Sequence, residues 1–510
     1  MSDLAPLLVA LPIFGSIMVF FAGLVRSESG WPIAVLTSLV QLGGAGLIAV
    51  RAFDEQPVEY VVGGFTAPYG IELVIDGLSA TMVVLIAVVA LGVLGYARVA
   101  GPRSNSFYAT YLLLVAGLTG MSITGDIFNM YVFLEITGLA TYALVASGKG
   151  GRSALAALKY LLVGTVGASL FLLGIGYAYV ATGTLNMADL SQQLPAVGSM
   201  GYTDPLVQAS FGLLVAGLFV KVAVFPVHTW QPEAYAGAPD SVSAYISALV
   251  STVAAYALMR IILSVFTVDF LVANSFARTV LVAGAVVSII FGSVLAVTQT
   301  EIKRMLAYSS VSQFGLVVGA IAVANVSALT GAMIHLVGHA IMKGGLFLTT
   351  GLVANSTGDR TIDGYEGLAE RSSIGAAVFG VLALAMVGVP PAVGFVGKWY
   401  IAVGAVEAEA WPLAVVILAS TLLTLAYFVR IIERMYFREP AKPSEAVETA
   451  ETETAASVVA DGHGTDAELA PVSTGMRATV LAAAVLAIVL GLGAFEYGQL
   501  LEPTIERLLA

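Results

Sequence analysis

Apolar stretches of about 20 residues recur from Leu7 to Gly493, and no other feature limits the fold as strongly. A helix of about 20 apolar residues crosses the hydrocarbon core of a bilayer. We count about fourteen such spans on this criterion, at 5–25, 31–50, 76–97, 107–124, 127–147, 154–182, 206–229, 241–266, 276–298, 304–324, 326–352, 374–402, 411–437 and 477–498. Only 11% of the residues are charged, against about one quarter in soluble domains. The chain is therefore predicted to be an all-α integral membrane protein.

The distribution of Lys and Arg between the loops predicts the orientation of the spans. Fourteen of the 22 basic residues lie in loops after odd-numbered spans. Only Arg51, Arg260, Arg278 and Arg507 lie on the opposite side. Because loops rich in Lys and Arg stay in the cytoplasm, both termini are expected outside it, in a multi-pass protein of the cell membrane. The opening MSDLAPLL has no Lys or Arg, so the first span is expected to be retained rather than cleaved as a signal peptide.

Two segments between spans have a composition of their own. PVEYVVGGFTAPYGIELVIDG alternates apolar and polar residues around Gly and Pro, which predicts a short exposed β-hairpin. Residues 439–470 hold eight acidic residues and one Lys, which predicts a disordered cytoplasmic linker. We divide the chain into 1–100 (three N-terminal spans and the hairpin), 107–266 and 276–437 (two five-helix repeats), 438–475 (the linker) and 476–510 (the last span and C-terminal tail).

Two of the spans contain proline well inside the apolar run. Pro226 follows Lys221 by five residues, and Pro390-Pro391 precede Lys398 by seven. Proline breaks a helix, and free backbone groups at membrane depth are tolerated only beside protein or water. A broken helix in each half of a transporter, next to a charge, is typical of inverted repeats around an ion site.

Four lysines, Lys159, Lys221, Lys343 and Lys398, lie within apolar spans. An ionised amine at such depth costs roughly 2.5–3.5 kcal/mol, so the lysines indicate a polar pathway through the membrane. For Lys398 the alternative is a side chain that reaches the membrane surface beside Trp399 and Tyr400. The same alternative holds for Lys159, which follows Arg152 by only seven residues.

Glu135 lies in the middle of the span at 127–147. A carboxylate at that depth must be protonated or paired, and Lys221 is the expected partner. A pair that forms and breaks would couple the proton affinity of the lysine to the position of the glutamate. The alternative is a permanent ion pair that holds two helices together.

His335, His339 and Lys343 follow one another at steps of four residues. On a helix they form one stripe roughly 12 Å long, along which water could relay protons. One alternative is a metal site, although Leu336 stands where a metalloprotease helix has Glu. The other is a pair of packed, hydrogen-bonded core histidines.

The chain has no Cys and only four His residues. Disulfides and Cys-ligated clusters are therefore excluded within this chain. We expect no cofactor, no metal site and no nucleic-acid partner.

Several of these segments resemble one known family. GDIFNMYVFLE, FVKVAVFPVHTWQPEAYAGAP, HLVGHAIMKGGLF and VPPAVGFVGKW are similar to the antiporter-type subunits shared by Mrp cation/proton antiporters and respiratory complex I. The similarity runs over nearly the whole chain. The first motif, together with GTLNMADLS, most resembles the D-type member of the Mrp antiporters.

The resemblance implies fourteen helices, two inverted five-helix repeats and a central axis of Glu and Lys. It implies Glu135 and Lys221 as a pair, and His335, His339, Lys343 and Lys398 as the relay of the second half. His228 matches a family position near the entry side. The chain departs from the family in the eighth span, where Thr252 or a neighbour replaces a Lys or His.

We therefore expect a proton-translocating subunit of a multi-subunit sodium/proton antiporter, a secondary transporter rather than an enzyme. Its partners would be the other subunits, protons, sodium ions and the lipid bilayer. The alternative is a proton-pumping membrane subunit of a complex I-like oxidoreductase or hydrogenase. A third interpretation is a partner in bicarbonate uptake.

Overall fold

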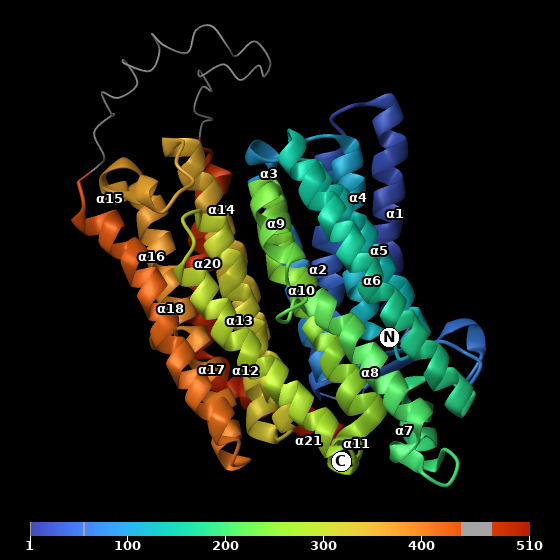
Figure 1. Ribbon diagram of the computed structural model, residues 1–510. Coiled ribbons are helices and arrows are strands. Elements are labelled where there is room, and N and C mark those ends of the chain that lie inside the picture. The colour runs from blue at the N-terminus through green and yellow to red at the C-terminus, as the bar shows by residue number, and fades with distance from the viewer. Residues whose placement is uncertain (1, 55–56, 440–471) are drawn as a thin grey trace, which may run out of the picture.

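Helices that run roughly alongside one another make up almost all of the computed structural model (Figure 1), which describes residues 2–54, 57–439 and 472–510. The N-terminal half of the chain lies beside the C-terminal half. The predicted linker at 438–475 falls almost wholly outside the described residues.

The described part of the first half contains ten α-helices and two strands. They are α1 (Leu4–Val25), α2 (Gly30–Asp54), β1 (Val58–Val61), β2 (Glu72–Ile75), α3 (Gly77–Ala100), α4 (Asn105–Ile123), α5 (Ile127–Ala146), α6 (Gly151–Thr182), α7 (Met187–Gln193), α8 (Pro205–Val222), α9 (Trp230–Gly237) and α10 (Asp240–Arg260).

Helices are the regular elements of the second half, within the described residues. After a π-helical segment, η4 (Ile261–Phe266), come α11 (Thr267–Ala273), α12 (Ser275–Val297), α13 (Ile302–Val323), α14 (Val326–Thr357), α15 (Leu368–Arg371), α16 (Ser373–Val387), α17 (Val393–Glu407), α18 (Trp411–Phe437), α20 (Thr474–Leu492) and α21 (Ala494–Leu509).

The prediction of an all-α membrane protein is confirmed. Within the described residues, thirteen helices are long and apolar enough to cross a membrane. The fourteenth expected span, 374–402, corresponds to α16 and α17, which have 15 residues each. Helices α10, α13 and α14 are almost wholly buried, whereas α1, α2, α6, α12, α18 and α20 expose large apolar side chains, as lipid-facing helices do.

Both proline breaks are present and are built alike. Helix α8 ends at Val222, and Ala223 follows in the left-handed region at φ 66° before Pro226. Helix α16 ends at Val387, and Gly388 follows at φ 100° before Pro390 and Pro391. A left-handed residue ends a helix, and the proline behind it prevents the helix from resuming.

The two halves also correspond in their short strand-like contacts. Asp126 bridges to Asn186 after α6, and Glu301 bridges to Thr361 after α14. In each case the partners are 60 residues apart, and α6 and α14 both have 32 residues. This correspondence supports a duplicated unit; the exact bounds of the repeats stay a prediction.

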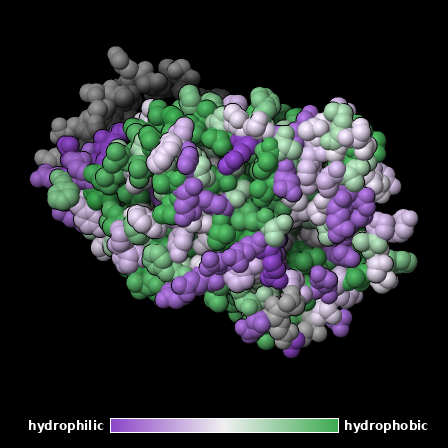
Figure 2. Space-filling model, turned by 90° about the horizontal axis from the view of Figure 1, so that it is seen from below, coloured by the Kyte–Doolittle hydropathy of each residue, from purple (hydrophilic) through white to green (hydrophobic). Residues whose placement is uncertain are grey.

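The predicted hairpin is present. β1 pairs antiparallel with β2, with Val58 opposite Ile75. The hairpin lies at the same end of the bundle as α7, α11 and α21 (Figure 1). We call this end the hairpin face. Viewed onto that face, hydrophilic side chains cross its middle (Figure 2).

Candidate functional site

Lys221 is the best-defined charged group of the first half. It lies in the last turn of α8, is 4% exposed, and its Nζ donates to the hydroxyl of Tyr142, 3.1 Å away. The ammonium also lies 5.6 Å from the centre of the Tyr142 ring. Gly138 on α5 leaves space for the ammonium because it has no side chain; an added Cβ would be 3.2 Å from the Lys221 Nζ.

Glu135 does not make the expected direct ion pair with Lys221. No described residue is hydrogen-bonded to its buried Oε1 atom. It lies on α5 one turn before Gly138, the residue that borders the Lys221 ammonium. The tyrosine hydroxyl takes the position at the lysine where a carboxylate was expected.

Polar side chains continue from Lys221 onto α9 and α10. The Ser251 hydroxyl donates to the Lys221 carbonyl oxygen at 3.3 Å, and the Gln231 amide donates to Ser251 at 3.2 Å. Beside Ser251, the buried hydroxyl of Thr252 has no hydrogen-bond partner in the described part of the chain, and neither has Oε1 of Gln231. Buried polar atoms without protein partners are usually satisfied by water, so the region around Thr252 can hold a hydrated connection.

The two histidines of α14 are fully buried. Their rings are 6.2 Å apart, and the Phe314 ring lies edge-on to His339 at 4.8 Å. All four ring nitrogens lack hydrogen-bond partners among the described side chains and backbone. Packed core histidines would have such partners, so this geometry favours a relay over the packing alternative.

Both lysines of the second half bind backbone carbonyl groups. The Lys343 Nζ donates to the Leu306 carbonyl at 2.7 Å and to the Ser309 hydroxyl. The Lys398 Nζ donates to the carbonyls of Met386 and Val387 at 2.8 and 3.0 Å. Because α16 ends at Val387, these carbonyls have no helical donor, and the break itself creates the binding position for Lys398.

The structure also orders the groups along α14. A Cβ built on Gly344, next to Lys343, would lie 3.4 Å from the Cβ of Ala248 on α10. A Cβ built on Gly397, next to Lys398, would lie 2.9 Å from the Cα of His335. These contacts place the Lys343 end of the stripe beside α10 and the His335 end beside α17.

Lys159 and His228 lie apart from this line of titratable groups. Lys159 is exposed on α6 and acts electrostatically on Glu233, so it is not part of the buried axis. His228 lies between α8 and α9, is 5% exposed and stacks on Phe225 at 5.1 Å. Its Nδ1 has no partner within the described ranges.

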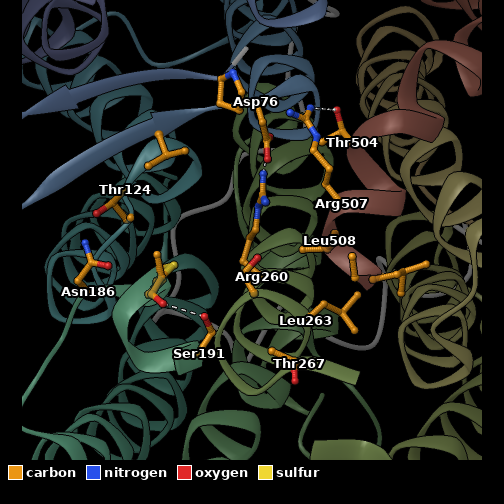
Figure 3. Close-up of a pocket in the computed structure, with 18 of the residues that line it drawn as sticks. Asp76, Thr124, Asn186, Ser191, Arg260, Leu263, Thr267, Thr504, Arg507 and Leu508 are labelled. Carbon is orange, nitrogen blue, oxygen red and sulfur yellow. Dashed lines mark hydrogen bonds and ion pairs between the residues drawn. The ribbon is translucent and has the colours of Figure 1, made fainter. Parts of the chain in front are cut away.

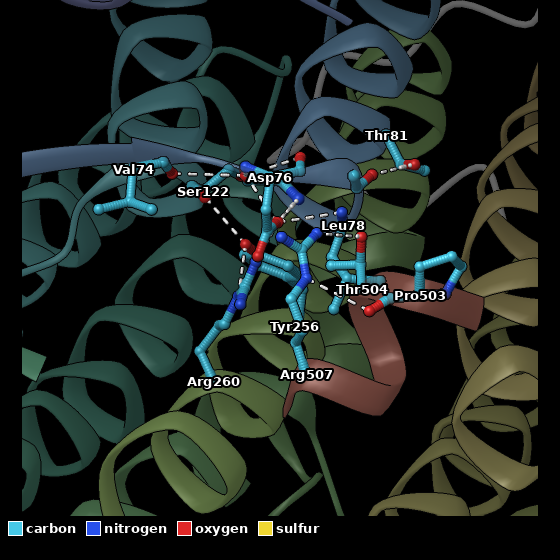
Figure 4. A network of polar contacts seen from close by, with 12 residues as sticks. Val74, Asp76, Leu78, Thr81, Ser122, Tyr256, Arg260, Pro503, Thr504 and Arg507 are labelled. Atoms are coloured by element: carbon cyan, nitrogen blue, oxygen red, sulfur yellow. Dashed lines mark hydrogen bonds and ion pairs between the residues drawn. The ribbon is translucent and has the colours of Figure 1, made fainter. Parts of the chain in front are cut away.

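Sequence reasoning missed several polar residues. Tyr142 and Gln313 could not be recognised in the sequence because neither side chain carries a charge. Both amide atoms of Gln313 are buried and have no hydrogen-bond partner among the described residues. Asp76 and Arg260 lie near the ends of the expected spans 76–97 and 241–266 and were given no role, yet they form an ion pair that is largely buried. Tyr256 donates to the Ser122 carbonyl beside this pair (Figure 4). The sequence did offer one indication of this pair: Arg260 lies near the end of an apolar run, and Asp76 is a single acid at the start of another span.

The sequence predicts no resident metal. In the described ranges, no group of three or more His, Asp or Glu side chains could hold one. The axis therefore consists of amines, imidazoles, hydroxyls and one carboxylate, which is a set suited to moving protons.

Comparison with known proteins places this arrangement in context. Residues 124–424 match a family model described as NADH:quinone oxidoreductase/Mrp antiporter, TM. The chain is 44% identical over 426 residues to NADH-quinone oxidoreductase subunit N of Desulforudis audaxviator, covering 82% of each chain. It is 31% identical to the D-type Na(+)/H(+) antiporter subunit of Bacillus subtilis, covering 78% of this chain and 81% of that one.

Among solved structures, the Mrp complex from a Dietzia species contains a chain that superposes with a TM-score of 0.87 at 26% identity. The match covers 100% of this chain and 97% of that one. The similarity therefore includes the N-terminal helices and α20 and α21, which lie outside the residues matched by the family model.

Proposed function

The chain belongs to the NADH:quinone oxidoreductase/Mrp antiporter transmembrane family, and we propose that it moves protons through the membrane as one subunit of a larger complex. The observation that carries this proposal is the buried line of titratable groups across both halves: Glu135, Lys221, Lys343, His339, His335 and Lys398. Burying such groups in a membrane bundle costs free energy, and groups of this kind mark ion and proton pathways.

In this proposal each step is electrostatic. A proton that binds Lys221 strengthens its attraction to Glu135, and its departure releases the glutamate. Through the hydrated region at Thr252, the change reaches Lys343, and the histidines pass the proton on to Lys398. Because neighbouring groups titrate together, the line behaves as one coupled system.

The finer function that we propose is sodium/proton antiport, with this chain as a secondary transporter subunit. Its support is the similarity to the D-type antiporter subunit and to the Mrp complex over the full chain. The chain offers no cage of several carboxylates for sodium among its described residues, so sodium would cross in a partner subunit.

A second candidate is a proton-pumping subunit of an oxidoreductase. The 44% identity to a subunit N favours it, and the proton axis would serve either complex. In both cases the chain would lie in the cell membrane, with the hairpin face and both termini outside the cytoplasm, according to the distribution of basic loops.

Two measurements test these proposals. Lys221→Ala and Glu135→Ala should abolish ion-coupled proton movement in vesicles while the complex still assembles; movement retained in both variants would contradict the pathway. Purifying the assembled complex and identifying its subunits separates the candidates, because iron–sulfur or quinone-site subunits would exclude the antiporter.

A further inference from the structure

A cavity of about 470 Å³ opens at the hairpin face (Figure 3), and its lining residues do not include the lysines and histidines of the axis. Its walls come from the hairpin, the segment before α7, the end of α10 with η4, and α21. Glu72, Asn186, Ser264 and Arg507 are among its lining residues. At roughly 30 Å³ per molecule, it has room for on the order of fifteen waters.

The lining of the cavity includes a charged pair, Asp76 and Arg260. Asp76 caps α3, and its Oδ1 is paired with the Arg260 guanidinium, each side chain being largely buried (Figures 3 and 4). The Arg260 Nε also donates to the Tyr256 hydroxyl at 2.8 Å, and that hydroxyl donates to the Ser122 carbonyl at 3.0 Å. The Asp76–Arg260 pair has no net charge and would not bind a hydrated ion strongly. The Tyr256 hydroxyl, in contrast, can pass a proton along its hydrogen bonds.

Beyond this point, polar groups lead along α10 toward Lys221. Thr252 precedes Tyr256 by four residues, one turn and about 6 Å along the helix. Its hydroxyl is fully buried and unpaired within the described chain. Ser251, beside it, is bonded to Gln231 and to the Lys221 carbonyl. Tyr256, Thr252 and Ser251 thus supply hydroxyl groups on α10 between the cavity and the backbone of Lys221.

The helix that carries this row changes geometry at the cavity. Directly after Arg260, α10 becomes the π-helix η4, and Leu263 and Ser264 of that segment line the cavity. Interruptions of an α-helix by π geometry are frequent at functional sites.

We propose that this cavity is a water-filled access route by which protons exchange between the hairpin face and the first half of the axis. The Asp76–Arg260 pair closes its floor to hydrated ions, and Tyr256 and Thr252 connect it to Lys221. The inference rests on the proposed function, because an access route matters only if the lysine axis moves protons.

The absence of cysteine from the chain allows a direct test. Single cysteines are placed at Ser264 near the mouth and at Ser122 at the floor. The matched control is Ser210, a fully buried serine of α8 that does not line the cavity. The assembled complex in sealed vesicles is treated from the hairpin face with trimethylammonioethyl methanethiosulfonate, which does not cross membranes, and modification is read on this subunit.

Ser264→Cys and Ser122→Cys should react at least about tenfold faster than Ser210→Cys, since only a hydrated thiol ionises and reacts readily. Reaction of Ser122→Cys no faster than Ser210→Cys overturns the access route. Modified Ser122→Cys vesicles should also lose most of their proton movement relative to the same vesicles before treatment. Unchanged proton movement after complete modification of Ser122→Cys would also overturn the access route.

The same vesicles separate this inference from the proposed function. If Lys221→Ala abolishes proton movement but modification at position 122 does not slow it, the access route fails and the pathway stands. If proton movement persists in Lys221→Ala, the pathway fails whatever the labelling shows.

Discussion

At the scale of single residues, each of the three lysines of the axis has a partner that suits a transient charge. Lys221 is bonded to a tyrosine hydroxyl, and Lys343 and Lys398 are bonded to backbone carbonyls. Such neutral partners stabilise an ammonium less than a carboxylate would. The amines are therefore held in place without a permanent ion pair, which leaves them free to release a proton.

Tyr142→Phe should slow proton movement about tenfold, because it removes the hydroxyl at Lys221 and leaves a buried donor unsatisfied, at about 1–3 kcal/mol. The measurement is ion-coupled acidification of vesicles, with assembly followed on native gels. Tyr179→Phe, the same change at an exposed position of α6, is the control. Equal rates in both variants would remove Tyr142 from the site.

Gly397→Ala should destabilise the complex by about 1–3 kcal/mol, the usual cost of overpacking. The added methyl would lie 2.9 Å from the Cα of His335, and neither backbone can move cheaply. Thermal unfolding in detergent measures the loss. Gly176→Ala on α6, where nothing lies within 4 Å, is the control and should be neutral or slightly stabilising.

At the scale of elements, α10 is fixed at both ends by ion pairs. At its start, Asp240 accepts from Lys303 at 3.1 Å and from Arg360 at 2.9 Å. At its end, Arg260 is paired with Asp76. An acid at the N-terminus and a base at the C-terminus both suit the helix dipole. The helix that carries Thr252 is thus held in position at both ends.

Asp76→Asn should cost about 3–5 kcal/mol at neutral pH, because it leaves Arg260 buried without its partner. Burial raises the pKa of the Asp76 carboxyl, but the Arg260 guanidinium outweighs it and lowers the pKa below its ordinary value. The pair therefore stabilises the fold fully above the unfolded carboxyl pKa of about 3.9 and ceases to do so as pH falls through the lower folded value.

The melting temperatures of wild type and Asp76→Asn should accordingly differ by a constant amount from pH 8 to about 5, and converge only below about pH 4. Asp269→Asn, an exposed acid of the same cavity, should show little difference throughout. Convergence already near neutral pH would contradict the direction given for Asp76.

At the scale of the whole molecule, the N-terminal and C-terminal halves meet along α10 and α14. Small residues allow the approach, since Gly344 faces Ala248. A charge that moves in one half can therefore act on the other through a short distance of low dielectric. The hairpin and α21 lie at the same end of this assembly (Figure 1).

The orientation in the membrane can be checked with two further single cysteines. Tyr69→Cys in the hairpin and Ser27→Cys between α1 and α2 are both at exposed positions at opposite ends of the bundle. In intact cells, an impermeant thiol reagent should label Tyr69→Cys and spare Ser27→Cys, because basic loops stay inside. The reverse pattern would invert the predicted topology.

Local properties of the sequence were enough to predict the membrane class, the spans, the hairpin and both helix breaks. Apolar runs, alternation around Gly and Pro, and the proline ring act without reference to distant residues. The same holds for Lys221, His335, His339, Lys343 and Lys398, because a titratable group within an apolar run is visible without coordinates.

The tertiary fold decided which side chains contact one another. It replaced the expected Glu135 contact at Lys221 with Tyr142, bonded Lys343 to Leu306 and Ser309 on α13, and left Lys159 on the exterior. It also joined Asp76 to Arg260, 184 residues apart. Such contacts depend on how helices cross and rotate about their axes. Packing between distant segments sets these angles, and a single sequence does not encode them locally.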